Sequence, residues 1–281
     1  MEDSKGRVAH VTRLMQRQLM NIDLFQYDQE LRKKTGKNLE QLAWERSGLP
    51  RPLGDLQGER MAVIPVTAGH GLISGFSDTV SLVLRHLGLR SDVTCNHDIA
   101  GIGEAAANGA TVLFCADDRL FLALDLRGGK YIDNARATAE MFMLAVEKMA
   151  GGLKGKKILI IGLGKVGVSC LNFALAKNES VHIHDIRPER SLEASQINNG
   201  VVVAGTLEKA CREAEIVIDA SSGEGFIPAT WLRDDVIIGA PGIPLGLTND
   251  AYHQFKDRLI HDPLPLGVAG MAAIILGTRN G

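Results

Sequence analysis

Three glycines at the spacing G-x-G-x-x-G follow a short apolar run in the middle of the chain. The run is Ile158–Ile161, and the glycines are Gly162, Gly164 and Gly167. In a strand–turn–helix unit the first glycine allows a tight turn, the second lets the backbone approach a pyrophosphate, and the third lets helix and strand pack closely. The helix N-terminus would then direct unpaired N–H groups at the phosphates. The pattern predicts a dinucleotide site at these glycines.

A carboxylate stands where the second strand of such a unit would end. Residues 181–185 form a second predicted strand, which ends in Asp185 about 20 positions after the glycines. A carboxylate there accepts hydrogen bonds from the ribose hydroxyls of NAD and repels the 2′-phosphate of NADP. Arg187 and Arg190 follow, and arginine is the residue that a phosphate site would use. We interpret Asp185 as dominant and expect NAD as the cofactor, with NADP as the alternative.

Further candidates come from the rule that ligands bind at the carboxyl ends of strands in a doubly wound sheet. In the second half of the chain the rule selects Ser221, in a run of small residues, and the pair Pro241 and Gly242. Loops of this kind are small enough to pass close to a nicotinamide ribose. In the first half the rule selects Thr67 and Ala68, which follow a predicted strand.

Two adjacent carboxylates end another predicted strand of the first half. Asp117 and Asp118 follow the strand predicted at 111–115, after Ala116. Facing a cofactor cleft, they could bind an ammonium group or hold a proton. In the alternative interpretation they form a turn, in which Asp118 pairs with Arg119 and caps the next element. The residues alone favour neither interpretation.

Hydrophobic periodicity places these candidates on an alternation of strands and helices. Residues 11–34 carry apolar side chains on one helical face, and Gly36 stands where a helix C-cap glycine would. After a Pro/Gly-rich break at 48–54, strands and helices alternate and end in a hairpin at 121–132. This order is typical of a small, mostly parallel sheet.

A long helix of strong helix formers, expected at 135–150, leads into a second alternation of short strands and helices. That alternation is typical of a doubly wound nucleotide-binding sheet. The apolar tail at 268–276 predicts a helix that packs at the domain junction. We predict an α/β protein, with N-terminal helices and a smaller α/β substrate domain at 1–148 and a C-terminal Rossmann NAD-binding domain at 149–281.

Composition describes an ordinary globular protein. The 281 residues are 45% hydrophobic and 23% charged, with a formal net charge of -2. We expect no nucleic-acid partner, because there is no basic run, and no membrane span or signal peptide, so a cytoplasmic location. The four cysteines are far apart and lack a ligand cluster, which favours reduced thiols and no metal site.

Specific segments resemble the pyrrolysine synthase family, also called 3-methylornithyl-lysine dehydrogenases. The resemblance runs from about residue 61 to 271 and depends most on Pro65-Val66-Thr67 and Ala116-Asp117-Asp118-Arg119. It implies the last step of pyrrolysine biosynthesis, in which NAD oxidises the terminal amine-bearing carbon of 3-methylornithyl-lysine. The product then condenses with the ornithyl α-amine and closes a pyrroline ring, which needs proximity more than strong catalysis.

The resemblance also implies roles for individual residues. Asp117 would be catalytic, binding the amino groups of the substrate or taking up a proton. The implied substrate-binding residues are Thr67, Ala68, Phe76, Asp117 and Asn134, and the implied cofactor-binding residues are Gly162, Gly164, Lys165, Val166, Gly167, Asp185, Ser221, Pro241 and Gly242. Ala68 stands where relatives carry a serine, so a hydrogen bond through that hydroxyl is missing here. A homodimer is the common outcome for such folds, and we expect one.

Two other functions compete with this interpretation. One is another NAD(P)-dependent dehydrogenase, of the amino-acid, opine or shikimate type, although no lysine, histidine or arginine base stands out near Thr67 or Asp117. The other is a non-catalytic NAD-sensing domain, which would usually be joined to a DNA-binding or membrane-gating module. No such module is evident, and the first half of the chain has the pattern of a pocket-forming domain.

Overall fold

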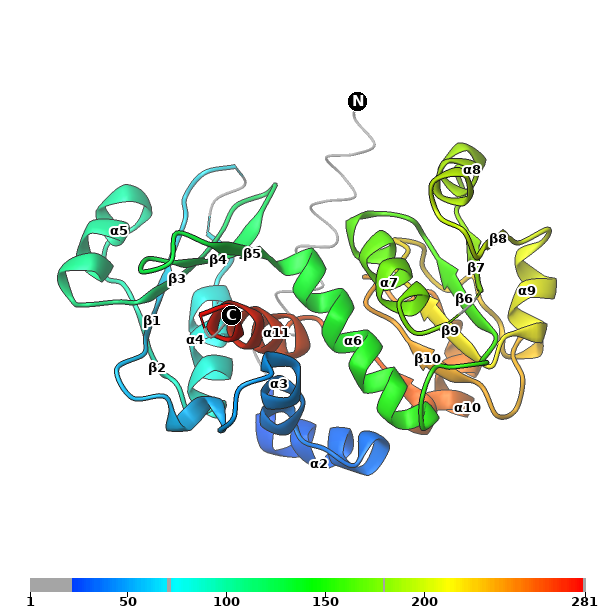
Figure 1. Ribbon diagram of the computed structural model, residues 1–281, viewed down its shortest axis with the longest axis horizontal. Helices are drawn as coiled ribbons and strands as arrows, with labels where there is room; N and C mark the ends of the chain where they lie inside the picture. The colour runs from blue at the N-terminus through cyan, green and yellow to red at the C-terminus, as the bar shows by residue number, and fades with distance from the viewer. Residues whose placement is uncertain (1–21, 70–71, 179, 280–281) are drawn as a thin grey trace. The chain divides into compact units, whose positions relative to one another are not determined.

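A computed structural model describes residues 22–69, 72–178 and 180–279, and these divide into two compact units. The first unit contains the described residues up to 32 together with 37–141 and those from 263 onward, and the second contains 33–36 and 142–262. The α/β class is as predicted (Figure 1). We predicted a boundary after residue 148, whereas this division falls after residue 141, assigns 33–36 to the second unit and assigns the last helix to the first. Among the described residues, no helix is long and apolar enough to span a bilayer.

The first unit is built on a five-stranded sheet with the order β2-β1-β3-β4-β5. Its strands are β1 (Arg60–Ile64), β2 (Arg90–Val93), β3 (Val112–Ala116), β4 (Phe121–Asp125) and β5 (Tyr131–Asp133). The first three are parallel, and β3, β4 and β5 pair in antiparallel fashion, which confirms the predicted hairpin. The carboxyl ends of β1, β2, β3 and β5 therefore meet at one edge of the sheet.

Helices cover both faces of this sheet. The helices that lie wholly or partly in this unit are α2 (Leu24–Thr35), α3 (Leu39–Ser47), α4 (Phe76–His86), α5 (Asp98–Ala107), α6 (Asn134–Ala150) and α11 (Pro265–Gly277), with a short 3-10 turn η1 (Leu53–Asp55). Side chains alternate along β1, so Ala62 and Ile64 pack with Ala105 of α5 on one face. The other face carries α4 and α11. The part of the predicted N-terminal helix before residue 22 lies outside the described residues.

The C-terminal helix α11 groups with the first unit, although it follows the second unit in the chain. Twelve of its thirteen residues are buried, and it carries no charged side chain. A helix that is apolar on all sides must be covered on all sides, and α11 finds this cover against α3, α4 and β4 of the first unit (Figure 1). Its glycines allow close approach, because a Cβ at Gly270 would lie 2.6 Å from the Met141 Cγ and 2.8 Å from the Ala137 carbonyl oxygen.

The second unit is a six-stranded, fully parallel sheet with the order β11-β10-β9-β6-β7-β8. Its strands are β6 (Ile158–Ile161), β7 (Val181–His184), β8 (Val201–Val203), β9 (Ile216–Asp219), β10 (Ile237–Gly239) and β11 (Leu259–Ile260). The chain starts in the middle, at β6, winds outward through β7 and β8, and then returns to wind outward through β9. This is the predicted doubly wound arrangement, and its switch point lies between β6 and β9.

Helices lie on both faces of the second sheet as well. The crossovers contain α7 (Lys165–Leu175), α8 (Pro188–Ile197), α9 (Leu207–Glu213), α10 (Asn249–Phe255) and the turns η2 (Ala229–Trp231) and η3 (Lys256–Arg258). One core joins Leu159, Val217 and Ile238 to residues of α9 and α10. On the opposite face Val146 of α6 packs against Gly239. Both faces of the central strands β6 and β9 are thus buried, as their continuous apolar runs require.

Close packing of α11 on α6 gives a stability prediction. We expect Gly270→Ala to lower the free energy of unfolding by about 1–3 kcal/mol, because its Cβ overlaps backbone that cannot move easily. Gly103→Ala on the exposed surface of α5 is the control, since nothing lies within 4 Å of its Cβ position. That variant should be neutral or more stable. Urea unfolding of both variants tests this, and equal effects would contradict it.

Candidate functional site

The glycine loop of the second unit has the geometry that a pyrophosphate site needs. Gly162 has a φ of +85°, and a Cβ there would lie 2.8 Å from the Ser221 backbone. A Cβ at Gly167 would overlap the Gly162 carbonyl oxygen, so only glycine lets α7 pack on the turn. Gly164 precedes α7, and a Cβ there would meet nothing within 4 Å. The backbone is therefore accessible at the position where the motif predicts the phosphates, beside the exposed Lys165.

The other predicted cofactor loops meet this turn at the switch point. A Cβ at Gly242 would overlap the Ser221 carbonyl oxygen, and the Gly242 N–H donates to the Asp219 carbonyl at 2.9 Å. Ser221 in turn lies against Gly162. The structure thus brings together loops that follow β6, β9 and β10, as the carboxyl-end rule predicts.

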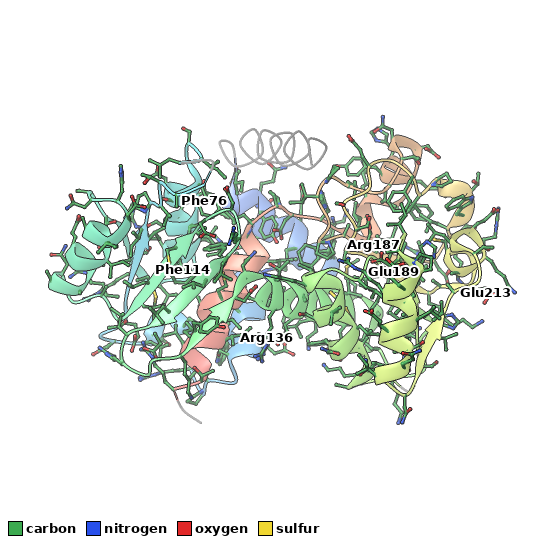
Figure 2. All side chains as sticks on the ribbon, turned by 90° about the horizontal axis from the view of Figure 1, so that it is seen from above. Phe76, Phe114, Arg136, Arg187, Glu189 and Glu213 are labelled. Carbon is green, nitrogen blue, oxygen red and sulfur yellow. The ribbon has the colours of Figure 1, made fainter. Side chains whose placement is uncertain are left out.

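Asp185 lies next to the glycine loop and is buried. Its carboxylate accepts the Leu163 N–H at 2.6 Å and the Arg187 N–H at 2.9 Å, and the Arg190 guanidinium is 3.8 Å away. Asp185 therefore ties the turn after β6 to the end of β7. The neighbouring Ile186 is 92% exposed, a large apolar side chain that sequence analysis did not select. Figure 2 shows Arg187 and Glu189 at the start of α8.

Asp219, the last residue of β9, is a site residue that sequence analysis missed. Its side chain is fully buried, and it accepts the Ser221 N–H at 3.1 Å, the Ser221 hydroxyl at 2.6 Å and the Gly246 N–H at 3.0 Å. Burial raises the pKa of this carboxyl to about 6, against the hydrogen bonds that favour the ionised form. The sequence contains one signal for this residue, which is an aspartate inside an apolar strand. A buried carboxylate needs hydrogen-bond partners that offset its lost hydration.

In the first unit, the predicted substrate-binding residues gather at the carboxyl edge of the sheet. Strand register pairs Ala116 with Phe121 and Leu122 with Asp133, so Asp117 and Asn134 leave the sheet at the same edge. Phe76 begins α4, and its ring packs edge-on against the Phe121 ring, 5.3 Å between centroids. Phe76 is half-buried and so retains an exposed part at this edge.

The loop after β1 joins the same group. Thr67 and Ala68 are exposed, and a Cβ on Gly69 would overlap the Asp118 carboxylate. The Thr67 hydroxyl and N–H both donate to Asp98, a residue that sequence analysis did not select. The structure therefore brings the loop after β1 against the turn that carries Asp117 and Asp118.

The two aspartates after β3 form a turn, and the Asp117 carboxylate holds it. The Asp117 carboxylate accepts the N–H groups of Arg119 and Leu120, each at 2.8 Å. These bonds hold the pKa of Asp117 below its ordinary value. The carboxylate is exposed and stays ionised at neutral pH, so it suits binding of an ammonium group better than storage of a proton.

Asn134 is the first residue of α6, and part of its side chain has a structural partner. Its Oδ1 accepts the Thr138 hydroxyl at 3.3 Å, and a Cβ at Gly267 of α11 would lie 2.7 Å from the same oxygen. Asp133, just before it, accepts the Ala135 N–H at 2.6 Å and caps the helix. Packing of α6 thus fixes where Asn134 stands at the edge.

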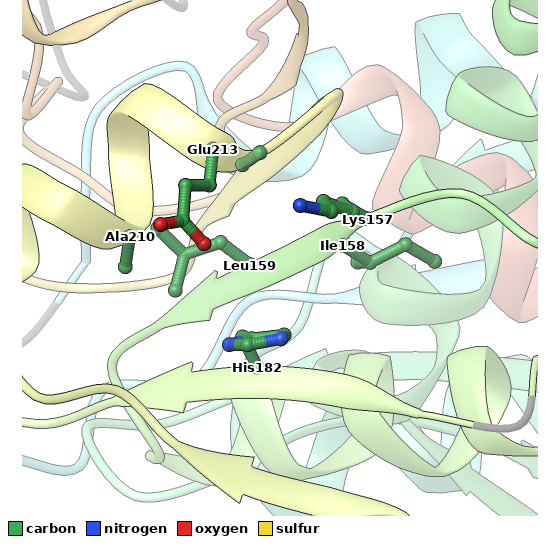
Figure 3. A pocket seen from close by; sticks show the side chains of 7 residues that line it. Lys157, Ile158, Leu159, His182, Ala210 and Glu213 are labelled. Carbon is green, nitrogen blue, oxygen red and sulfur yellow. The ribbon is translucent and has the colours of Figure 1, made fainter.

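Two cavities lie away from the candidate site residues. The cavity of about 10 Å³ between Lys157, His182 and Glu213 has room for about one water molecule and lies at the amino end of β6 (Figure 3). A groove of about 640 Å³ in the first unit is lined by residues that include Leu56, Glu59 and Arg279, next to the amino end of β1. Both lie away from the carboxyl edges where the candidates gather.

Comparison with known proteins identifies the family. A family model described as the pyrrolysine biosynthesis protein PylD, N-terminal domain, matches residues 16–132. The pyrrolysine synthase of Methanosarcina barkeri is 30% identical over 218 residues, which are 78% of this chain and 81% of that protein. The chain belongs to the pyrrolysine synthase family. The pyrrolysine synthase of Methanosarcina acetivorans is 27% identical over 257 residues, 92% of this chain and 96% of that protein.

Membership of the pyrrolysine synthase family confirms the resemblance found in the sequence motifs. The second unit also matches a model described as Mur ligase MurD-like, N-terminal domain, over residues 156–251. Among solved structures, the methylenetetrahydrofolate dehydrogenase/cyclohydrolase of Campylobacter jejuni is 14% identical, with a TM-score of 0.58. That similarity covers 89% of this chain and 99% of the other, and it shows a common fold.

The buried Asp219 gives a pH prediction. Its pKa is raised from 3.8 to about 6, so the native state keeps the proton to a higher pH than the unfolded chain. Its contribution to the free energy of unfolding is then greatest below pH 4 and falls by about 3 kcal/mol as the pH rises to 6. In Asp219→Asn this decline should be absent. Urea unfolding at several pH values tests this, and identical pH dependence in both proteins would contradict it.

Proposed function

We propose that the protein catalyses the NAD-dependent oxidation of 3-methylornithyl-lysine and its closure to pyrrolysine. The observation that carries this proposal is the 30% identity with a pyrrolysine synthase over most of both chains. The gathering of Thr67, Phe76, Asp117 and Asn134 at one sheet edge supports it, because these residues are the ones that the family motifs imply as substrate contacts.

The reaction needs one two-electron oxidation and one ring closure. The terminal carbon of the ornithyl side chain loses a hydride, which NAD accepts, and its amine becomes an iminium ion. The ornithyl α-amine then attacks this carbon, and ammonia leaves as the cyclic imine forms. A five-membered ring closes readily when both groups are held on one substrate, so the protein contributes mainly orientation and exclusion of water.

The second unit supports NAD as the cofactor. The open space at Gly164 and the exposed Lys165 suit the pyrophosphate, and the remaining lone pairs of Asp185 suit the ribose hydroxyls. Ile186 offers an apolar surface to the adenine ring. Ser221 and the loop of Pro241 and Gly242 would flank the nicotinamide end, held in place by Asp219.

Asp117 is the residue that we assign to the reacting end of the substrate. Its ionised carboxylate would bind an amino group of the substrate, while Phe76 would pack on the methylated part and Asn134 would contact the amide. Because its pKa is lowered, Asp117 does not retain a proton at neutral pH, so we assign it to binding of the substrate ammonium, and the proton released during oxidation ends in the solvent. The expected homodimer and cytoplasmic location remain predictions, and light scattering of the purified protein tests the former.

NADH formation with purified protein, NAD and synthetic 3-methylornithyl-lysine tests the function. We expect absorbance at the NADH wavelength to rise together with a product of the mass of pyrrolysine. Binding of NAD without turnover would refute the substrate assignment, and a panel of amines and amino acids would then identify which other dehydrogenase this is.

The role of Asp117 predicts a large effect of Asp117→Asn. The amide oxygen can still accept the N–H groups of Arg119 and Leu120, so the turn should survive. Loss of the charge should lower kcat/KM about 100-fold, with NAD affinity unchanged. Asp55→Asn, an exposed aspartate of the same unit, is the matched control. Full activity of Asp117→Asn would remove Asp117 from the site.

The role of Asp185 predicts a change in cofactor preference. Asp185→Asn removes the charge that repels a 2′-phosphate but leaves Arg187 and Arg190 in place. The ratio of the NADP to NAD dissociation constants should fall about tenfold. Asp235→Asn, an exposed carboxylate of the same unit paired with Arg233, serves as control. An unchanged ratio would show that Asp185 does not select the cofactor.

A further inference from the structure

Asp98, at the start of α5, makes three hydrogen bonds to the loop that follows β1. Its N–H donates to the Pro65 carbonyl at 3.0 Å. Its carboxylate accepts the Thr67 N–H at 2.8 Å through one oxygen and the Thr67 hydroxyl at 2.5 Å through the other. The end of β1 and the start of α5 are thereby joined at the candidate substrate edge.

The backbone of Asp98 has an unusual conformation at this contact. Its φ is +52°, and it is the sole non-glycine residue with a positive φ in the described part of the chain. Aspartate and asparagine adopt this conformation more readily than most residues, but it still costs free energy relative to an ordinary helical start. The conformation is what allows one residue to bond Pro65 with its N–H and Thr67 with its carboxylate.

The bond from Thr67 decides what its hydroxyl can offer to a ligand. A hydroxyl has one proton and two lone-pair sites, and here the proton is donated to Asp98. The Thr67 oxygen can therefore only accept further hydrogen bonds. Donation by Thr67 also keeps the pKa of Asp98 below its ordinary value, so the carboxylate stays ionised at neutral pH. At the same edge, the ionised Asp117 is likewise an acceptor.

We propose that Asp98 is a positioning residue of the substrate site, which orients the Thr67 hydroxyl as an acceptor for an N–H group of the substrate. The inference rests on the proposed function and makes it more specific. An ammonium group has three donors and no acceptor, so it matches an edge that presents the Thr67 oxygen and the Asp117 carboxylate together. A ligand group that must accept a hydrogen bond finds no donor on either side chain.

Asp98→Asn tests whether the Thr67 hydroxyl acts as a hydrogen-bond acceptor, and it keeps a side chain of similar size at position 98. The amide oxygen can still accept the Thr67 N–H, but the amide nitrogen would donate to the Thr67 oxygen and release the hydroxyl proton toward the ligand. Asparagine also tolerates the positive φ. We expect the KM for 3-methylornithyl-lysine to rise about tenfold, with kcat changing less and NAD affinity unchanged.

Variants of Thr67 show whether Asp98 influences the KM through the Thr67 hydroxyl. Thr67→Ser keeps the hydroxyl and should retain the wild-type KM, whereas Thr67→Val removes it and should raise the KM. In the Thr67→Val background, Asp98→Asn should add little, because the group it acts through is gone. Additive effects of the two substitutions, or an unchanged KM in Asp98→Asn, would overturn the inference.

Glu104→Gln is the matched control on the same helix. Its carboxylate also binds loop backbone, at the N–H groups of Cys95 and Asn96, but it does not touch the loop after β1. Its KM should stay at the wild-type value. A raised KM in this variant equal to that of Asp98→Asn would mean that both act by loosening α5, and would overturn the specific role of Asp98.

Hydrogen exchange separates this inference from the proposed function. Asp98→Gly removes the carboxylate at a position whose φ suits glycine, so the Thr67 amide should exchange faster without loss of α5. If wild-type protein fails to oxidise 3-methylornithyl-lysine, the proposed function fails and the role for the substrate ammonium fails with it. Unchanged exchange at Thr67 in an active enzyme would instead refute the positioning contact alone.

Discussion

The same constraint acts on both sheets. Loops that leave the carboxyl ends of parallel strands contain backbone N–H groups that have no hydrogen-bond partner in the sheet. Polar groups of this kind are costly to leave unpaired, so each loop needs an acceptor. Four aspartates supply it: Asp98 for Thr67, Asp117 for Arg119 and Leu120, Asp185 for Leu163 and Arg187, and Asp219 for Ser221 and Gly246. The carboxylates hold the loops, and the loops carry the candidate site.

This use of carboxylates has a chemical consequence. Asp98 and Asp117 pair with backbone N–H groups and have lowered pKa values, so both stay ionised at neutral pH, and a carboxylate whose pKa is lowered is a weak general base. Asp219 differs because it is fully buried, and desolvation raises its pKa. The first unit therefore offers fixed negative charge, which suits recognition of an amine whose oxidation is carried out by the cofactor.

Close backbone approach is the second physical requirement of the fold. Gly162 and Gly167 let the turn after β6 pack against the loop of Ser221 and against α7, and Gly270 lets α11 pack against α6. At each of these positions a Cβ would come within 3.0 Å of backbone atoms. Glycine in the cofactor loop serves a ligand as well, whereas glycine in α11 serves only the packing of helices.

The sequence by itself determined the features that depend on local spacing. The glycine motif, Asp185 at the end of the next strand, the hairpin after Asp117 and the two α/β alternations follow from periodicity and residue type, and the structure has them all. The family likewise followed from short motifs such as Pro65-Val66-Thr67. These patterns specify an element and its ends because the chemistry involved spans only a few residues.

Tertiary structure decided which distant segments meet. Periodicity shows that α11 is apolar but not which unit covers it, and the helix returned to the first unit because α3, α4 and β4 offered a complete cover. The sequence also did not reveal that Asp98 bonds Thr67 or that Asp219 bonds Gly246, since these partners lie 31 and 27 positions away. Spacing along one strand or helix carries no information about which remote N–H group needs a carboxylate.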